Sequence, residues 1–224
     1  MANYEIFETK ERILADNDAA ASQLRRQLRA QGVYFVNLMA SPGSGKTTLL
    51  LALIERLKDK LKIGVMEADV DSDVDAAKMQ SAGVKTIQLH TGGLCHMDAD
   101  MTSRAVERLN ASELDLLVLE NIGNLVCPAE FDVGSDLNLM ILSVPEGDDK
   151  PLKYPLMFKV SDVMVVNKMD TLPAFDFDIE KAAERARALN PAIEVFPVSA
   201  RTGEGVDALA EFLLKKVNEK RAAL

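Results

Sequence analysis

The fold of this chain can be predicted from one stretch of its sequence, Leu38-Met39-Ala40-Ser41-Pro42-Gly43-Ser44-Gly45-Lys46-Thr47-Thr48. An apolar run over 33–38 leads into it and predicts a buried strand, and a leucine-rich run over 48–54 follows it and predicts a helix. A strand, a glycine-rich turn with Lys-Thr and a helix form, in this order, a phosphate-binding loop, or P-loop. The sequence therefore predicts that this part of the chain holds the phosphates of a nucleotide.

Each part of the predicted P-loop has a physical role. The glycines let consecutive backbone N–H groups surround phosphate oxygens, and the N-terminus of the following helix adds positive potential. Lys46 is placed to reach the β- and γ-phosphates, and the Thr47 hydroxyl can bind Mg²⁺. The usual first glycine is Ala40 here, at a position that opens the loop, where we expect a small residue to suffice. The predicted phosphate-binding residues are Gly43, Ser44, Gly45, Lys46, Thr47 and Thr48.

The composition limits the class of protein. The chain has 224 residues, of which 48% are hydrophobic, a size that suits one sizeable α/β domain. Its net charge of −9 disfavours nucleic acid as a main partner, because no surplus of positive charge is available to neutralise phosphates. No apolar run approaches the roughly 20 residues of a membrane span. Two cysteines are too few for a disulfide framework, so we expect a soluble cytoplasmic protein without a membrane partner.

The hydrophobic pattern divides the chain into a leader, 1–32, and a domain, 33–224. Apolar residues between Ile13 and Leu28 recur at helical spacing and predict an amphipathic helix that ends near Gly32, packed on the domain or forming a dimer contact. From residue 33 onward, runs of Val, Ile and Leu alternate with helical segments, which indicates a three-layer α/β domain with a mostly parallel central sheet. The expected strands are 33–38, 62–68, 84–89, 114–119, 139–144, 163–167 and 193–198, and the expected helices of the domain are 48–54, 99–109, 178–189 and 206–219.

Aspartates at alternate positions follow the second predicted strand, from Asp69 to Asp75. A solvated loop and a helix cap would explain most of them. The carboxyl end of a parallel strand beside a P-loop is, however, where ligands bind in doubly wound sheets. We therefore select Asp69 and Asp71 as candidates to hold Mg²⁺ or its water ligands, with Asp75 behind them.

A second element, Asn167-Lys168-Met169-Asp170, predicts that the nucleotide base is guanine. A carboxylate can accept two hydrogen bonds from the ring N–H and the exocyclic amine of guanine, and adenine presents no such pair. Asp170 is thus expected to select GTP, while the stem of Lys168 lies over the base. Ser199-Ala200 is similar to the Ser-Ala element of GTPases whose backbone N–H contacts guanine O6. The predicted base-binding residues are Asn167, Lys168, Asp170, Ser199 and Ala200.

Glu120-Asn121-Ile122-Gly123 lies where GTPases carry Asp-x-x-Gly. Glu120 can act through a water bound to Mg²⁺, and the N–H of Gly123 can sense the γ-phosphate, which makes Gly123 a candidate switch hinge. Asn124 follows where many fast GTPases place a glutamine that orients water, so we expect slow hydrolysis until a partner or a second subunit raises the rate. The predicted catalytic residues are Lys46, Asp69, Glu120 and Gly123, and the predicted Mg²⁺ residues are Thr47, Asp69, Asp71 and Glu120.

Both cysteines and one of the two histidines lie at informative places. Cys95-His96 follows a Gly-Gly turn, and Cys127 lies four residues after Gly123. Thiolate and imidazole suit Zn²⁺ and Ni²⁺, and water, Asp98 or a second subunit is available as a fourth ligand. A role as small core residues, or as a disulfide, remains the alternative. Because Cys127 shares a short loop with Gly123, a nucleotide-gated metal site has a physical route, whereas His90 reads as a strand-end residue.

Between Tyr34 and about Val217, the chain resembles the HypB family of hydrogenase nickel-incorporation GTPases. Six motifs carry the resemblance: Ser-Pro-Gly-Ser-Gly-Lys-Thr-Thr at 41–48, Gly-Gly-x-Cys-His-x-Asp at 92–98, Glu-Asn-Ile-Gly-Asn-Leu-Val-Cys-Pro at 120–128, Lys-Tyr-Pro at 153–155, Asn-Lys-Met-Asp at 167–170 and Ser-Ala-Arg-Thr-Gly-Glu-Gly at 199–205. The leader departs from some members of the family, because it has neither a cysteine cluster for tight nickel binding nor a histidine-rich segment for nickel storage.

The resemblance implies a dimerising P-loop GTPase of the signal-recognition/MinD-like class, which hydrolyses GTP to GDP with Mg²⁺. It implies a metallochaperone that helps insert nickel into the [NiFe] hydrogenase large subunit, with a HypA-type accessory protein as partner. It also implies that Cys95, His96 and Cys127 bind nickel or zinc at a homodimer interface. The nearest alternative is the urease-type nickel accessory GTPase, whose metal pair is typically Cys-x-His. A phosphotransferase and a scaffold that binds GTP without hydrolysing it are alternatives from other classes.

Overall fold

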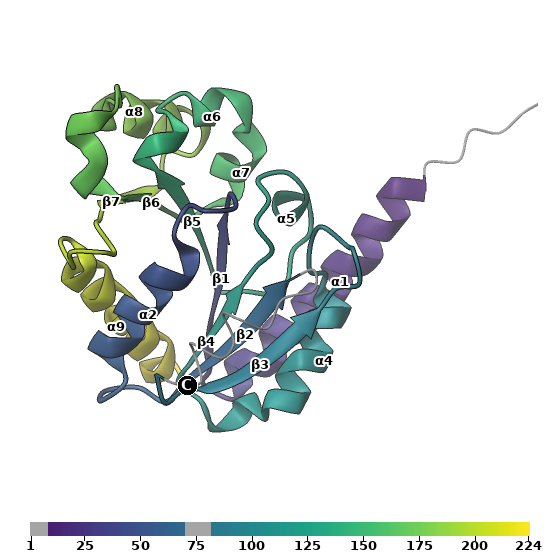
Figure 1. Ribbon diagram of the computed structural model, residues 1–224. Coiled ribbons are helices and arrows are strands. Elements are labelled where there is room, and N and C mark those ends of the chain that lie inside the picture. Colours follow the sequence, from purple (N-terminus) through teal and green to yellow (C-terminus); the bar gives the residue numbers. More distant parts are fainter. Residues whose placement is uncertain (1–8, 70–81) are drawn as a thin grey trace, which may run out of the picture.

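Seven parallel strands form the centre of the computed structural model, which describes residues 9–69 and 82–224 (Figure 1). The strand order is β3-β2-β4-β1-β5-β6-β7, so the chain leaves β1 toward one edge and later crosses to the other side of β1. This reversal creates a topological switch point at the carboxyl end of β1, where ligands bind in such sheets. The strands are β1 (Tyr34–Ala40), β2 (Ile63–Asp69), β3 (Lys85–His90), β4 (Leu116–Glu120), β5 (Leu137–Ser143), β6 (Val163–Asn167) and β7 (Glu194–Pro197).

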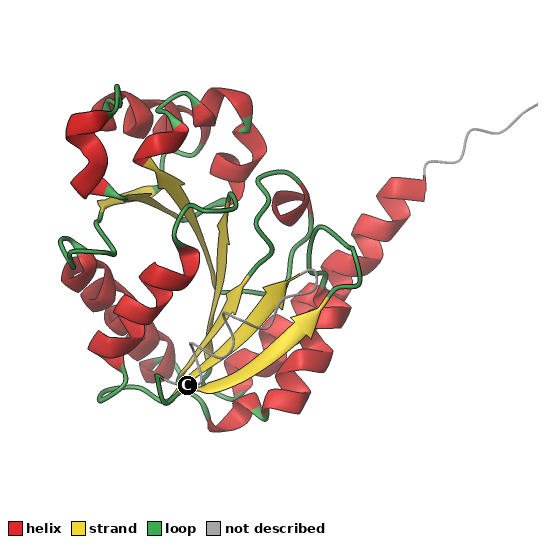
Figure 2. Ribbon diagram, in the orientation of Figure 1, coloured by secondary structure: helices red, strands yellow, loops and turns green. Residues whose placement is uncertain are grey.

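Helices cover both faces of the sheet, which confirms the predicted three-layer α/β architecture (Figure 2). α2 and α9 lie on one face, and α1, α4, α7 and α8 contribute to the cores on the other face. The helices are α1 (Thr9–Ala30), α2 (Lys46–Leu57), α4 (Ala99–Leu109), α5 (Cys127–Glu130), α6 (Lys150–Lys153), α7 (Pro155–Val160), α8 (Ile179–Leu189) and α9 (Val206–Ala222), with 3₁₀ turns at Ala111–Glu113, Val144–Glu146 and Met169–Ala174.

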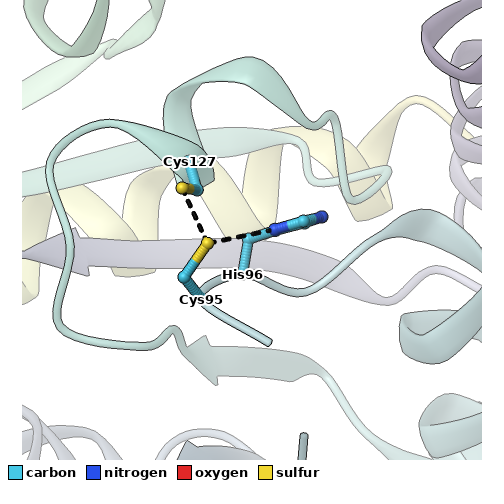
Figure 3. Close-up of side chains that lie close together, drawn as sticks. All are labelled: Cys95, His96 and Cys127. Carbon is cyan, nitrogen blue, oxygen red and sulfur yellow. Dashed lines mark hydrogen bonds between the residues drawn. The ribbon is translucent and has the colours of Figure 1, made fainter. Parts of the chain in front are cut away.

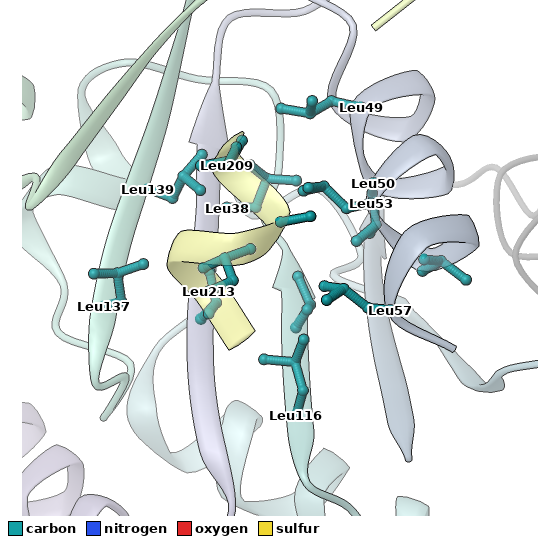
Figure 4. Close-up of a cluster of buried hydrophobic side chains, with 14 of the residues drawn as sticks. Leu38, Leu49, Leu50, Leu53, Leu57, Leu116, Leu137, Leu139, Leu209 and Leu213 are labelled. Atoms are coloured by element: carbon teal, nitrogen blue, oxygen red, sulfur yellow. The ribbon is translucent and has the colours of Figure 1, made fainter. Parts of the chain in front are cut away.

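The alternation of side chains along β1 sorts the core into its two layers. Leu38 points toward the face covered by α2 and α9, where it packs in one cluster with Leu53 and Leu213 (Figure 4). Phe35 points to the opposite face and packs with residues of α1 and α4. Successive residues of a strand point to opposite sides of the sheet, and β1 is apolar on both except for Asn37. The buried strand predicted before the P-loop therefore lies at the centre of the sheet.

α1 packs on the face of the sheet that it shares with α4. Leu24 and Leu28 are buried in the same cluster as Phe35 and Val106. The helix ends at Ala30, and Gly32, two residues later, adopts a left-handed φ of 74°. Within the described ranges, no helix combines the length and the apolar character that a membrane crossing requires.

Candidate nucleotide and metal site

The P-loop connects the carboxyl end of β1 to the first turn of α2, which begins at Lys46. Gly43 and Gly45 adopt φ angles of 74° and 98°, a region that side chains with a Cβ rarely enter. A Cβ at Gly45 would also lie only 2.6 Å from Nδ2 of Asn167. The loop therefore requires glycine at position 45 for its backbone conformation and for the close approach of Asn167.

The predicted base-binding residues meet the P-loop from the other half of the sheet. The amide of Asn167 donates to the carbonyl of Ser44 at 2.9 Å and accepts from the N–H of Ala200 at 3.1 Å. Lys168 takes a left-handed conformation at φ 63°, and its Nζ donates to the carbonyl of Gly43 at 2.6 Å. Positive φ at a lysine is strained and recurs at functional sites, where surrounding contacts hold it. The side chains of Asn167 and Lys168 thus contact the backbone of the P-loop, although they follow it by more than 120 residues in the sequence.

Asp170 lies at the start of a 3₁₀ turn directly after Lys168. Its Oδ1 accepts a hydrogen bond from the hydroxyl of Ser199 at 2.6 Å, and its side chain is 20% exposed. The guanidinium of Arg201 approaches Oδ2 at 4.0 Å. The carboxylate is therefore oriented by Ser199 and remains accessible to a ligand.

Thr47 and Glu120, two predicted Mg²⁺ residues, lie in direct contact. The Thr47 hydroxyl donates to Oε1 of Glu120 at 2.8 Å, and Glu120 is only 2% exposed at the end of β4. Asp69 ends β2, on the neighbouring strand. Asp71 and Asp75 lie outside the described residues. The structure thus brings an alcohol and a carboxylate, the oxygen ligands that Mg²⁺ prefers, to the first turn of α2.

Glu67 is a buried acidic residue that belongs to none of the sequence motifs. It lies in β2, is 3% exposed and pairs in register with Glu120 of β4. Because residues two apart share a face of a strand, Glu67 and Asp69 face the same side as Val65, which packs with α2. The sequence contains one indication of this residue, because Glu67 is the single charged residue in the otherwise apolar run from Ile63 to Ala68.

The loop after β4 contacts the P-loop directly. A Cβ on Gly123 would lie 3.0–3.1 Å from the side chain and backbone of Pro42. The next residue, Asn124, donates from Nδ2 to the carbonyl of Cys95 at 3.4 Å and accepts from the N–H of Val126 at 2.8 Å. The side-chain amide of Asn124 therefore links, by hydrogen bonds, the segment that carries Cys95 and the segment that leads to Cys127.

Cys95, His96 and Cys127 converge from two loops, and their potential ligand atoms lie within 4.8 Å of one another (Figure 3). The two Sγ atoms are 2.7 Å apart and both thiols are free, and Sγ of Cys95 lies 3.7 Å from Nδ1 of His96. Cys95 is exposed, which contradicts its interpretation as a core residue. Two sulfurs and one imidazole suit a single Zn²⁺ or Ni²⁺ ion, with bonds of about 2.0–2.3 Å for zinc.

The surroundings of the cluster favour ligation by a neutral imidazole. The ring of His96 stacks on that of Phe131 at 3.8 Å between centroids, and burial lowers the pKa of His96. The hydrogen bond with Cys127 raises the pKa of the Cys95 thiol, so a metal ion must displace this proton to bind. Asp98 instead caps α4, because its Oδ1 accepts from the N–H of Met101 at 2.8 Å. His90 ends β3, as predicted from the sequence.

Comparison with solved structures identifies the class of the fold. Signal recognition particle receptor FtsY from Elizabethkingia anophelis matches with a TM-score of 0.55 at 14% identity, covering 85% of this chain and 72% of that chain. MinD from Aquifex aeolicus matches with a TM-score of 0.54 at 15% identity, covering 81% and 97%. At such identities the likeness concerns the fold alone, and it confirms the fold predicted for this chain, a parallel sheet covered by helices as in FtsY and MinD.

Closer relatives share much more of the sequence. Hydrogenase maturation factor HypB of Rhizobium leguminosarum bv. viciae is 45% identical over all of this chain and 74% of its own length. HypB of Azotobacter vinelandii is 50% identical over 87% of this chain, which spans 64% of that relative. The crystal structure of HypB from Helicobacter pylori in complex with nickel matches with a TM-score of 0.85 at 37% identity, covering 92% of this chain and 97% of that one.

The family model described as CobW/HypB/UreG, nucleotide-binding domain, matches residues 34–197, from β1 to the end of β7. This range includes the P-loop, the Asn-Lys-Met-Asp element and all three residues of the Cys/His cluster. A P-loop domain of this family implies nucleotide hydrolysis. The chain therefore belongs to the HypB family of hydrogenase maturation factors, within the CobW/HypB/UreG group of nucleotide-binding proteins.

Proposed function

We propose that this protein is a GTP-hydrolysing metallochaperone that helps insert nickel into the large subunit of a [NiFe] hydrogenase. One observation carries the proposal. The segment from Glu120 to Cys127 contacts the P-loop through Gly123 at one end and supplies a thiol to the Cys/His cluster at the other. A change at the γ-phosphate therefore has a path of a few residues to a metal ligand.

The proposed hydrolysis rests on the P-loop and its neighbours. Backbone N–H groups of the loop bind phosphate oxygens, and Lys46 neutralises charge that develops on the β- and γ-phosphates. Thr47, Glu120, Asp69 and Asp71 would hold Mg²⁺, which supplies charge neutralisation at the phosphates when bound. The N–H of Gly123 donates to the γ-phosphate, so cleavage removes the contact that holds this loop.

The proposed specificity for GTP rests on Asp170. Its carboxylate is accessible and is oriented by Ser199, as two hydrogen bonds to guanine require. Asn167 ties the base-binding segment to the P-loop at Ser44, and Ala200 places its backbone beside Asn167. Base recognition and phosphate binding are thereby held in a fixed relation.

Nickel is the proposed cargo of Cys95, His96 and Cys127, and zinc fits the same donors. Three ligands from one chain leave a coordination position for water or for a second subunit. Leu94 and Val126, directly beside the two cysteines, are 44% and 50% exposed. Exposed apolar residues that flank a metal site suit a homodimer contact, where two clusters face each other. A HypA-type accessory protein is the proposed partner for transfer.

Two measurements on the purified protein test the proposal. We expect GTP to be hydrolysed in preference to ATP, and Lys46→Ala to abolish turnover, while Lys60→Ala, which changes an exposed lysine in the turn that follows α2, retains it. We also expect Ni²⁺ to bind the wild type and to bind Cys127→Ser at least tenfold more weakly. Equal hydrolysis of ATP and GTP, or nickel binding that ignores Cys127, would contradict the assignment.

A further inference from the structure

We propose that Asn17, on α1, is a positioning residue for the Cys/His cluster, an inference that rests on the proposed metal function. Asn17 is only 9% exposed although its side chain is polar. Its Oδ1 accepts from the N–H of Ala99 at 2.9 Å, and its Nδ2 donates to the carbonyl of Asp132 at 2.9 Å. A backbone N–H can only donate and a carbonyl can only accept, so these two partners fix the orientation of the amide.

The two partners of Asn17 belong to the two segments that carry the metal ligands. Ala99 begins α4, three residues after His96, and Asp132 lies five residues after Cys127. Phe131, next to Asp132, stacks on the ring of His96. One buried amide therefore connects the backbone that follows His96 with the backbone that follows Phe131. It thereby sets the distance between the segment that carries Cys95 and His96 and the segment that carries Cys127.

A second contact from α1 supports the same segment. Nη2 of Arg25 donates to the two carboxylate oxygens of Asp132 at 2.8 and 2.7 Å, and its Nε donates to the carbonyl of Ser135 at 2.9 Å. Arg25 follows Asn17 by two helical turns, so both side chains extend from one side of α1. The helix is anchored in turn by Leu24 and Leu28, which are buried in the core. The helix thus supports the metal site, although none of its described side chains belongs to the Cys/His cluster.

The expected size of the effect follows from the chemistry of metal sites. Partners beyond the ligands orient them, and their removal typically lowers metal affinity by about 10- to 100-fold. Loss of Asn17 also leaves the N–H of Ala99 without this acceptor at the first turn of α4. The cluster then keeps its three ligands and loses the constraint on their separation.

The test measures Ni²⁺ affinity by competition with a chelator, and the absorption spectrum of the Co²⁺-loaded protein, which reports coordination geometry. We expect Asn17→Ala to weaken Ni²⁺ binding by about tenfold or more and to change the Co²⁺ spectrum. Asn17→Asp keeps the acceptor for Ala99 and places an oxygen against the Asp132 carbonyl, so the same losses are expected. Gln23→Ala, which removes an exposed amide from the same helix, should behave as the wild type.

A destabilised control separates positioning from general loosening. Leu28→Ala removes a fully buried side chain of α1 that contacts neither metal loop through a hydrogen bond. We expect it to lower the thermal midpoint at least as much as Asn17→Ala and to leave the Ni²⁺ affinity and the Co²⁺ spectrum unchanged. If Leu28→Ala weakens metal binding as Asn17→Ala does, or if Asn17→Ala binds as the wild type, the positioning role is wrong. If Cys127→Ser also binds as the wild type, the metal assignment itself fails.

Discussion

At the residue scale, the candidate site consists of polar side chains gathered at the carboxyl ends of β1, β4 and β6. Asn167 and Glu120 are almost completely buried, yet each has a partner from the P-loop or α2. Burial of such groups is tolerated because their hydrogen bonds are made, and it holds them in one orientation. Asp170 and Cys95 are accessible, which suits residues that contact a ligand.

Exchange of Asp170 for asparagine tests base recognition. Asp170→Asn replaces an acceptor by a donor, so the variant should lose affinity for GTP by about 10- to 100-fold and gain affinity for XTP, whose base has a carbonyl in place of the amine. Titration with fluorescent GTP and XTP analogues measures both affinities. Asp176→Asn, at an exposed aspartate nearby, serves as the control. Unchanged affinity for GTP in Asp170→Asn would refute the assignment.

Removal of the Cys95 thiol tests whether this residue serves metal binding or the core. Because Cys95 is exposed, Cys95→Ala should change the free energy of unfolding of the metal-free protein by less than about 0.5 kcal/mol while it weakens Ni²⁺ binding. Urea unfolding with a chelator present measures the first quantity, and a metal competition assay measures the second. A loss of several kcal/mol without metal would instead assign Cys95 a structural role.

At the element scale, the loop that follows β4 connects the two parts of the site. Its Gly123 lies against Pro42 of the P-loop, and its Asn124 lies between the cysteine-bearing loops. Gly123→Ala forces the loop away from Pro42, because the added Cβ would lie 3.0–3.1 Å from three of its atoms. We expect hydrolysis to fall at least tenfold, measured as phosphate release under saturating GTP. Gly83→Ala places its Cβ in open space at a left-handed φ of 82°, so it should cost some stability and retain the rate.

The apolar packing of α9 on the sheet and on the buried side of α2 should contribute to stability, whereas Lys46 and Thr47 at the start of α2 belong to the candidate site. Leu213 of α9 is 3% exposed and packs in the cluster that contains Leu38 and Leu53. Leu213→Ala should lower the free energy of unfolding by about 2–5 kcal/mol. Lys215→Ala, at a side chain that is 74% exposed on the same helix, should change it by less than about 0.5 kcal/mol. Urea denaturation measures the free energy of unfolding of both variants. A loss below about 1 kcal/mol for Leu213→Ala would contradict the core assignment.

The elements with strong hydrophobic patterns were predictable from the sequence, and the short ones were not. The predicted strand 163–167 coincides with β6, and the predicted helix 99–109 coincides with α4. The fourth strand begins at Leu116 rather than at residue 114, since Leu114 ends a 3₁₀ turn. α5, α6 and α7 have four to six residues each, too few to produce a helical period, and they were missed.

The same distinction applies to the site. Thr47 contacts Glu120 and Asn167 contacts the P-loop, and these residues were predictable from motifs. Each motif occurs at a fixed place relative to the end of a strand, and the strand ends meet at one edge of the sheet. Glu67 and Asn17 have no motif, and their positions depend on the register of β2 with β4 and on the packing of α1. Such long-range relations leave little trace in one sequence. Asp71 remains a prediction, since it lies outside the described residues.

At the scale of the whole molecule, three buried apolar clusters hold the sheet and its helices together, and Cys95, His96 and Cys127 belong to none of them. Removal of metal should therefore leave the fold intact. We expect a chelator to shift the thermal midpoint of the protein by no more than about 2–4 °C, the shift that about 1 kcal/mol produces in a protein of this size. A shift of more than about 10 °C in circular dichroism melts would show that the metal has a structural role.

In the proposed function, the nucleotide and the Cys/His cluster are coupled through the loop between Glu120 and Cys127. The most direct test is the Ni²⁺ affinity of the protein loaded with GDP and with a non-hydrolysable GTP analogue, measured for the wild type and for Cys127→Ala. Coupling between two sites typically changes affinity by about 5- to 150-fold. We expect a change of this size in the wild type and none in Cys127→Ala. The same nickel affinity in both nucleotide states of the wild type would contradict this coupling.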